Sequence, residues 1–248
     1  MGIYDLIIPS REIDLILENI HLSPQNRDIL DQLLNEFKHF GAIREYDLPI
    51  DNKILLHGHS GCGKTATAKA IAKKLDKKII ILNLGTIVSS KLGETAKNVA
   101  QIFHKATNEK AVLFIDEFDF LGKLRDYDDK DSGEMKRLVN TIIQLMDYLP
   151  PDTLLIAATN HVDIIDKAIL RRFQLKLKFE LPTPDALDEY YTELLGRYPE
   201  AYRNIERKYN ISYAEAKDVV HRLVKKQIIE WEERSMPDPL DTEPILKV

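Results

Sequence analysis

Short apolar runs of strand length alternate with helical patterns from residue 54 to residue 179. The apolar runs are Ile54–His57, Ile79–Leu84, Val112–Ile115, Leu154–Ala158 and Leu175–Phe179. Between them, apolar residues recur at helical spacing over Ala66–Leu75, Glu94–Ala106 and Glu134–Tyr148. This alternation predicts an α/β fold, with a parallel sheet flanked by helices on both faces. The unbroken apolarity of Val112–Ile115 predicts a central strand that is buried on both sides.

The segments before and after this alternation are predicted to be helical. Ser23 followed by Pro24 is typical of a helix start, and Gly41 predicts the end of that helix. Pro182 and Pro184 cannot continue a strand ladder. After these prolines, helical patterns cover Asp185–Leu195, Glu200–Tyr209 and Tyr213 to about Glu233. We therefore expect an α/β domain over residues 1–181 and a small all-helical domain over residues 182–235. Residues 236–248, rich in proline and acids, are expected to form a flexible tail.

Composition and charge narrow the choice of partners and compartment. The 248 residues include 35 Lys+Arg and 40 Asp+Glu, for a net charge of −5, and this acidic balance disfavours nucleic acid as the main partner. The single cysteine cannot form an internal disulfide, which fits a reducing compartment. The sequence has neither a secretion signal nor an apolar run of ~18 residues. We expect a cytoplasmic protein without a membrane partner.

A glycine-rich loop carries the first candidate chemistry. The run Gly58-His59-Ser60-Gly61-Cys62-Gly63-Lys64-Thr65 follows the pattern G-x-x-x-x-G-K-[ST], between a predicted strand and a predicted helix. Glycines let the backbone curl so that its N–H groups point at phosphate oxygens, and the helix adds its positive end. In such a loop Lys64 reaches the β- and γ-phosphates, and the Thr65 hydroxyl is a ligand for Mg²⁺. The predicted ATP contacts are Gly58, His59, Ser60, Gly61, Cys62, Gly63, Lys64, Thr65 and Ala66.

Three side chains around this loop also have simpler interpretations. Cys62 could act as a redox switch, but a small residue whose backbone makes the contacts is favoured. His57 and His59 have no partners at metal-ligand spacing, so structural histidines are favoured.

Two acids at the end of the Val112–Ile115 strand carry the second candidate chemistry. Ligands of open α/β sheets bind at the carboxyl ends of the strands, where Asp116 and Glu117 are expected. Asp116 can hold Mg²⁺ through water, and Glu117 can orient and polarise the attacking water. An acidic surface loop is the alternative, but the upstream phosphate loop favours hydrolysis of ATP.

Two further motifs complete a family pattern. The strand that begins at Leu154 ends in Thr159 and Asn160, and Leu170-Arg171-Arg172-Phe173 follows it. With the glycine-rich loop and the Asp116–Glu117 pair, in this order, the chain resembles the AAA family of ATPases from about Ser23 to Glu233. The form of the last motif looks closest to the katanin and spastin branch.

This resemblance implies an ATPase that uses ATP and Mg²⁺ and forms a homo-oligomeric ring, with six subunits as the expected number. Asn160 matches the residue called sensor 1, which helps Glu117 to place the water. Arg171 and Arg172 match the arginine fingers, which reach the ATP of the neighbouring subunit and neutralise charge on the transferred phosphoryl group. The helical domain resembles the AAA lid. The expected function is remodelling or regulation of a protein partner, with a substrate or adaptor supplied by another chain.

The loop before Gly93 departs from the family pattern. Relatives that thread proteins have an aromatic residue where this chain has Lys91, although Leu92 keeps the apolar neighbour. Tyr127, in an acidic stretch, could serve a second pore loop or lie in a solvated loop. The missing aromatic favours an alternative function, a nucleotide-dependent assembly switch or scaffold without threading. A DNA-associated loader is a third alternative, which the acidic balance disfavours.

Overall fold

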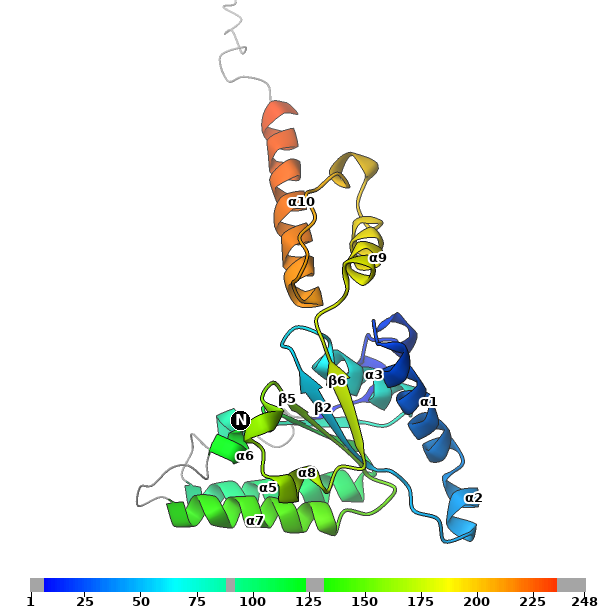
Figure 1. The fold of residues 1–248 in the computed structure, drawn as a ribbon, viewed down its shortest axis with the longest axis vertical. Coiled ribbons are helices and arrows are strands. Elements are labelled where there is room, and N and C mark those ends of the chain that lie inside the picture. The colour runs from blue at the N-terminus through cyan, green and yellow to red at the C-terminus, as the bar shows by residue number, and fades with distance from the viewer. Residues whose placement is uncertain (1–6, 88–91, 124–131, 236–248) are drawn as a thin grey trace, which may run out of the picture. The chain divides into compact units, whose positions relative to one another are not determined.

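The computed structural model describes residues 7–87, 92–123 and 132–235, and it divides between Glu180 and Leu181 into two compact units (Figure 1). The first unit contains a six-stranded sheet in the order β1-β3-β4-β5-β2-β6. Its strands are β1 (Ile7–Ile8), β2 (Lys53–Gly58), β3 (Ile79–Asn83), β4 (Val112–Asp116), β5 (Leu154–Thr159) and β6 (Leu175–Phe179). Strands β2 to β6 pair in parallel, and β1 pairs antiparallel with β3.

Helices cover both faces of this sheet, as the alternating pattern predicts. The helices of the first unit are α1 (Pro24–Lys38), α2 (Phe40–Glu45), α3 (Lys64–Lys74), α4 (Leu84–Ile87), α5 (Leu92–Asn108), α6 (Phe120–Lys123), α7 (Ser132–Asp147) and α8 (Lys167–Leu170). Short 3-10 turns cover Ser10–Glu12 (η2), Leu17–Asn19 (η3) and Val162–Ile164 (η4). The predicted α/β class is confirmed. None of the described helices is long and apolar enough to cross a membrane.

The two faces of β4 contribute to different cores, because successive side chains of a strand point to opposite faces. Leu113 and Ile115 pack with residues of α5 and α7, whereas Val112 and Phe114 pack with residues of α1 and α3. All four side chains are fully buried. The prediction of a central strand buried on both sides is therefore confirmed.

Two local predictions in this unit need correction, and one strand was not predicted. Leu84 does not extend β3 but begins α4. Gly41 does not end the first helix: the break comes at His39 (φ −104°, ψ 23°), and Gly41 lies inside α2, where glycine is tolerated at a cost of about 1 kcal/mol. Strand β1 was not predicted, because two residues are too short to show a period.

The second unit has a helical core made by α9 (Pro184–Leu195) and α10 (Tyr213–Ser235), with a 3-10 turn, η5 (Glu200–Tyr202), between them. The helix predicted over Glu200–Tyr209 is wrong beyond Tyr202, because residues 203–209 have no regular secondary structure.

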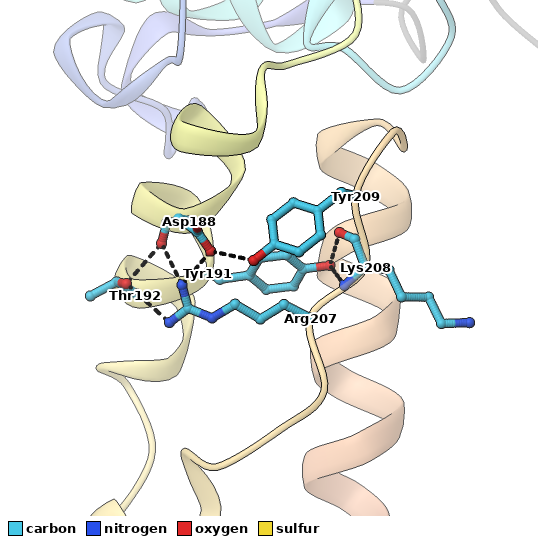
Figure 2. A network of polar contacts seen from close by, with 6 residues as sticks. All are labelled: Asp188, Tyr191, Thr192, Arg207, Lys208 and Tyr209. Atoms are coloured by element: carbon cyan, nitrogen blue, oxygen red, sulfur yellow. Dashed lines mark hydrogen bonds and ion pairs between the residues drawn. The ribbon is translucent and has the colours of Figure 1, made fainter.

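Polar contacts with α9 explain this irregular segment (Figure 2). The Tyr191 hydroxyl donates to Lys208 O at 2.9 Å and accepts from Lys208 N at 3.2 Å. The Arg207 guanidinium pairs with Asp188 Oδ1 at 2.6 Å, and the Tyr209 hydroxyl donates to the same oxygen at 2.9 Å. The backbone N–H and C=O of Lys208 are thus satisfied by the neighbouring helix rather than by helical bonds of their own.

Candidate active site

The predicted phosphate loop, Mg²⁺ ligands, base and sensor lie where four parallel strands end. The strand register places His57 opposite Thr159 and Asn83 opposite Asp116. The carboxyl ends of β2, β5, β4 and β3 therefore meet along one edge of the sheet. This is the edge at which ligands of open α/β sheets bind.

The loop after β2 needs glycine at two positions for different reasons. Gly58 has φ 124°, and a Cβ there would lie 2.1 Å from Phe179 O, so β6 approaches the loop too closely for any side chain. His59 N donates to the same carbonyl at 2.9 Å. Gly63 has φ 100° and turns the chain directly into α3. A residue with a Cβ would be strained in either conformation.

The start of α3 is suited to an anion. No side chain caps this helix, so its first N–H groups have no side-chain acceptor. The Lys64 ammonium lies against the loop and donates to Gly58 O at 2.8 Å and to His59 O at 2.7 Å. Burial lowers the pKa of Lys64, while Cys62 and the carboxylate of Asp116 act in the opposite direction. These groups present positive charge to the inside of the loop.

Thr65 and Asp116, the two predicted Mg²⁺ ligands, lie together. Thr65 Oγ1 donates to Asp116 Oδ2 at 3.3 Å, which joins the start of α3 to the end of β4. Within the described ranges no group of three or more His, Cys, Asp and Glu side chains could hold a metal. Mg²⁺ commonly binds through one or two protein groups, with waters and substrate phosphates completing its shell. One hydroxyl and one carboxylate therefore fit a Mg²⁺ ion that is shared with a nucleotide.

Glu117 has an unusual backbone and a close neighbour. Its φ of 53° is a left-handed conformation that few non-glycine residues adopt. A Cβ built on Gly85 would lie 2.3 Å from Glu117 Oε2 and 3.2 Å from Asn83 Oδ1. The exposed carboxylate of Glu117 thus lies over the start of α4, beside the last residue of β3. The sequence did not predict Gly85 or Asn83, because their proximity to Glu117 depends on the pairing of β3 with β4.

The segment after β5 is tied to the segment after β4. Thr159 Oγ1 donates to the buried Asp119 carboxylate at 3.0 Å and accepts from His161 N at 2.9 Å. Asn160 lies between these two bonded residues and is exposed. Its position at the carboxyl end of β5 agrees with a side chain that faces a ligand at this edge.

His57 lies at the same edge, in a positively charged environment. Burial lowers its pKa most, and the charges of Lys178, Lys176 and Lys64 lower it further, whereas Asp163 acts in the opposite direction. These lysines belong to β6 and to α3. A neutral His57 therefore fits the structural role that the sequence favoured.

Arg171 and Arg172 lie at the opposite edge of the sheet. They follow α8, and Gln174 N then donates to Lys53 O at 3.1 Å, where Lys53 is the first residue of β2. The Arg172 guanidinium makes two bonds to Asp147, at 2.8 and 2.9 Å, and one to Ala168 O at 2.6 Å.

Arg171 is held more loosely than Arg172. Its side chain is exposed and contacts Lys167 O at 3.3 Å. By contrast, the hydrogen bonds to Asp147 raise the pKa of Arg172. The two arginines that the sequence treated as equivalent therefore differ in their surroundings.

Three predicted residues cannot be placed in the site. Lys91 and Tyr127 lie outside the described residues, and Leu92 is described only as the first backbone position of α5.

Comparison with known proteins gives a consistent result. The model of the family described as "ATPase family associated with various cellular activities (AAA)" matches residues 54–181. The chain is 36% identical, over 215 residues, to the uncharacterized AAA family ATPase y4kL of Sinorhizobium fredii, covering 86% of this chain and 65% of the relative. It is 30% identical, over 271 residues, to the proteasome-associated ATPase of Geodermatophilus obscurus, covering 93% of this chain and 44% of the relative.

A third relative and a solved structure extend this comparison. The chain is 35% identical, over 169 residues, to proteasome-activating nucleotidase 1 of Halobacterium salinarum, covering 66% of this chain and 41% of the relative. The chain spans less than two thirds of the length of these three relatives. The crystal structure of the FIGL-1 AAA domain in complex with ADP has a similar fold, with a TM-score of 0.73 at 21% identity. This match covers 94% of this chain and 80% of that structure's chain.

Proposed function

This chain is an ATPase domain of the AAA family, as its motifs predict, and we propose that it hydrolyses ATP at sites shared between identical subunits of a ring. The energy of hydrolysis would serve to remodel or regulate a protein partner. Each subunit supplies the phosphate loop, the metal ligands and the base for its own ATP. The arginine comes from the neighbouring subunit.

The residues of one subunit divide the work on its own ATP. The loop backbone and Lys64 bind the phosphates. Thr65 with Asp116 would hold a Mg²⁺ ion, which would supply positive charge to the phosphate oxygens. Glu117 orients and polarises the attacking water and accepts its proton. Asn160, at the end of the adjacent strand, helps to position that water.

The separation of Arg171 from the phosphate loop is the observation that carries this proposal. The loop begins at Gly58, the last residue of β2, while the turn that follows Arg172 is bonded to Lys53, the first. Five residue steps of a strand cover about 16 Å at ~3.3 Å each. Arg171 thus lies at the wrong end of the sheet to reach the ATP of its own subunit. An exposed arginine at that end is available to another copy of the chain.

The protein partner is proposed from the relatives. Two of them are named as proteasome-associated or proteasome-activating proteins, so those proteins act with a protein complex. The acidic balance of this chain also disfavours nucleic acid as the main partner.

Mixing two inactive variants tests the shared site. Arg171→Ala keeps the base but loses the finger, and Glu117→Gln keeps the finger but loses the base. Each protein alone should turn over ATP at least on the order of 10²-fold more slowly than wild type. In mixed rings a finger from Glu117→Gln subunits meets an intact base on Arg171→Ala subunits, so activity should partly return. A mixture that forms mixed oligomers and stays inactive contradicts the proposal.

The lysine at position 91 supports a second candidate function. A lysine where threading relatives have an aromatic residue favours a nucleotide-dependent switch or scaffold that does not thread its partner. Lys91→Ala separates the two functions. Remodelling of the partner should be lost in a threading ring and kept in a switch, while ATP turnover survives in both.

A further inference from the structure

Two buried aromatic rings connect the segment that carries the base with the segment that carries the fingers. The rings of Phe118 and Phe173 meet edge to face, with centroids 5.4 Å apart and an interplanar angle of 82°. Phe118 is 0% exposed and Phe173 is 3% exposed, and both belong to the same core. Edge-to-face pairs of this kind stabilise beyond the area that they bury.

Each of the two rings directly follows a predicted catalytic residue in the chain. Phe118 directly follows Glu117, and Phe173 directly follows Arg172. Phe173 and the Arg172–Asp147 pair are therefore two anchors of the turn that presents Arg171. Phe173 packs against Phe118, the residue next to the base.

We propose that the Phe118–Phe173 contact couples the conformation of the base in one subunit to the position of the arginine fingers that this subunit offers to its neighbour. The coupling passes through the body of one subunit and links two different ATP sites. It rests on the proposed function, in which fingers act on the neighbouring ATP.

The backbone of Glu117 is the point at which a second arrangement, which such coupling needs, would arise. Its left-handed backbone (φ 53°) is a strained conformation for a residue with a side chain, so a change of conformation there releases strain. Phe118 N donates to Ala158 O at 2.9 Å in this conformation. When Glu117 leaves the left-handed region, the peptide that follows it turns, and the Phe118 ring has to shift with it. Because the core is close-packed, Phe173 cannot stay in place when its partner ring moves.

The turn that presents Arg171 is also placed to move with the Phe173 ring. Phe173 packs in the same core as Ile169 of α8. A shift of the Phe173 ring therefore acts on the turn from both sides, at Ile169 before Arg171 and at Phe173 after Arg172. The exposed side chain of Arg171 donates a hydrogen bond to Lys167 O at 3.3 Å, one helical turn earlier in the chain. Its position is thus set by the turn.

The test changes the ring in a subunit whose own site is already inactive. A donor carrying Glu117→Gln is mixed with the Arg171→Ala acceptor, so that all turnover arises at acceptor sites served by donor fingers. Phe118→Leu is then added to the donor. We expect turnover of the mixture to fall roughly three- to tenfold, the range set by the strength of an aromatic pair. The affinity of the acceptor for ATP should not change.

Two further donors separate coupling from a general loss of packing. Phe103→Leu, in the same core but on α5, should leave turnover of the mixture unchanged. A donor with both Phe118→Leu and Phe173→Leu should be no slower than the donor with Phe173→Leu alone, because the two residues act through one contact. Met in place of Leu serves the same test should a Leu variant not assemble.

The outcomes are distinct. Full turnover with the Phe118→Leu donor, or an equal loss with the Phe103→Leu donor, overturns the coupling. If the parent mixture of Glu117→Gln and Arg171→Ala recovers no activity, the shared site itself fails, and the coupling fails with it.

Discussion

Replacing Gly85 by alanine would place a methyl carbon 2.3 Å from Glu117 Oε2. Ordinary contact begins at 3.4 Å, so the two atoms must separate by at least 3.4 − 2.3 = 1.1 Å. The atom that meets the methyl group is the far end of a flexible, exposed side chain, so the carboxylate moves and the backbone does not. The substitution therefore displaces the carboxylate that we propose as the base.

The substitution should leave the stability of the fold unchanged or raise it, but it should lower the rate of catalysis. Gly85 lies in α4 and does not have a positive φ, so alanine should be neutral or stabilise by up to about 1 kcal/mol. A displacement of about 1 Å at a catalytic group can cost on the order of 10²-fold in rate, or about 2.7 kcal/mol in the activation barrier. We expect kcat to fall by this factor while Tm stays the same or rises.

The assay compares Gly85→Ala with Gly41→Ala. A Cβ at Gly41, inside α2, has nothing within 4 Å, so this control should keep wild-type kcat. Steady-state turnover gives kcat, and equilibrium binding of a fluorescent ATP analogue gives the affinity, which should be the same in all three proteins. Wild-type or higher turnover in Gly85→Ala refutes the reasoning, because the position of the carboxylate over Gly85 would then not matter to catalysis. A loss of nucleotide affinity would refute it too.

Three other predictions follow from the geometry of the site. Arg171→Ala should lose about 10²–10⁵-fold in kcat. Arg172→Ala and Asp147→Asn should lose less and by similar factors, because Arg172 acts through its ion pair with Asp147. A larger loss for Arg172→Ala than for Arg171→Ala would make Arg172 the finger. Because the pKa of His57 is lowered from 6.5 in the folded protein, the unfolded chain takes up the proton first, and stability should decrease as the pH falls below 6.5. His57→Gln should lessen the difference in Tm between about pH 7.5 and about pH 5.5, and an unchanged difference contradicts the cause. Cys62 is buried and lies within 3.7 Å of a loop carbonyl, so it should be replaceable by alanine with full activity. An inactive but folded Cys62→Ala protein would indicate a chemical role.

Much of the candidate site could be predicted because its residues are neighbours along the chain. The phosphate loop is one continuous run, and Asp116 and Glu117 are adjacent. The prediction that Thr65 and Asp116 share a metal needed only the rule that parallel strands end at one edge, and the two side chains do lie 3.3 Å apart.

The contacts that position these residues could not be predicted in this way. Gly85 meets Glu117 only because β3 pairs with β4 in one register, and Asp147 meets Arg172 only because α7 ends near α8. No local pattern encodes either contact. The same holds for the segment after Tyr202, whose helical spacing is overridden by hydrogen bonds to α9.

The location of the movable parts follows from the packing of the sheet. Residues 112–115 of β4 are fully buried between two cores, and a close-packed core cannot deform continuously, so the strands are expected to behave as one rigid body. The proposed base, Glu117, and the proposed fingers both lie just outside the strands, at opposite ends of that body. Under the proposed shared site, a signal between two ATP sites would start in the turn after Asp116 and arrive in the turn before Leu175, with the packed core between them. Phe118 and Phe173 are one residue from the base and from the arginine pair, and they are in contact. For this reason the arrangement of the sheet, rather than the motifs themselves, favours communication through these two rings.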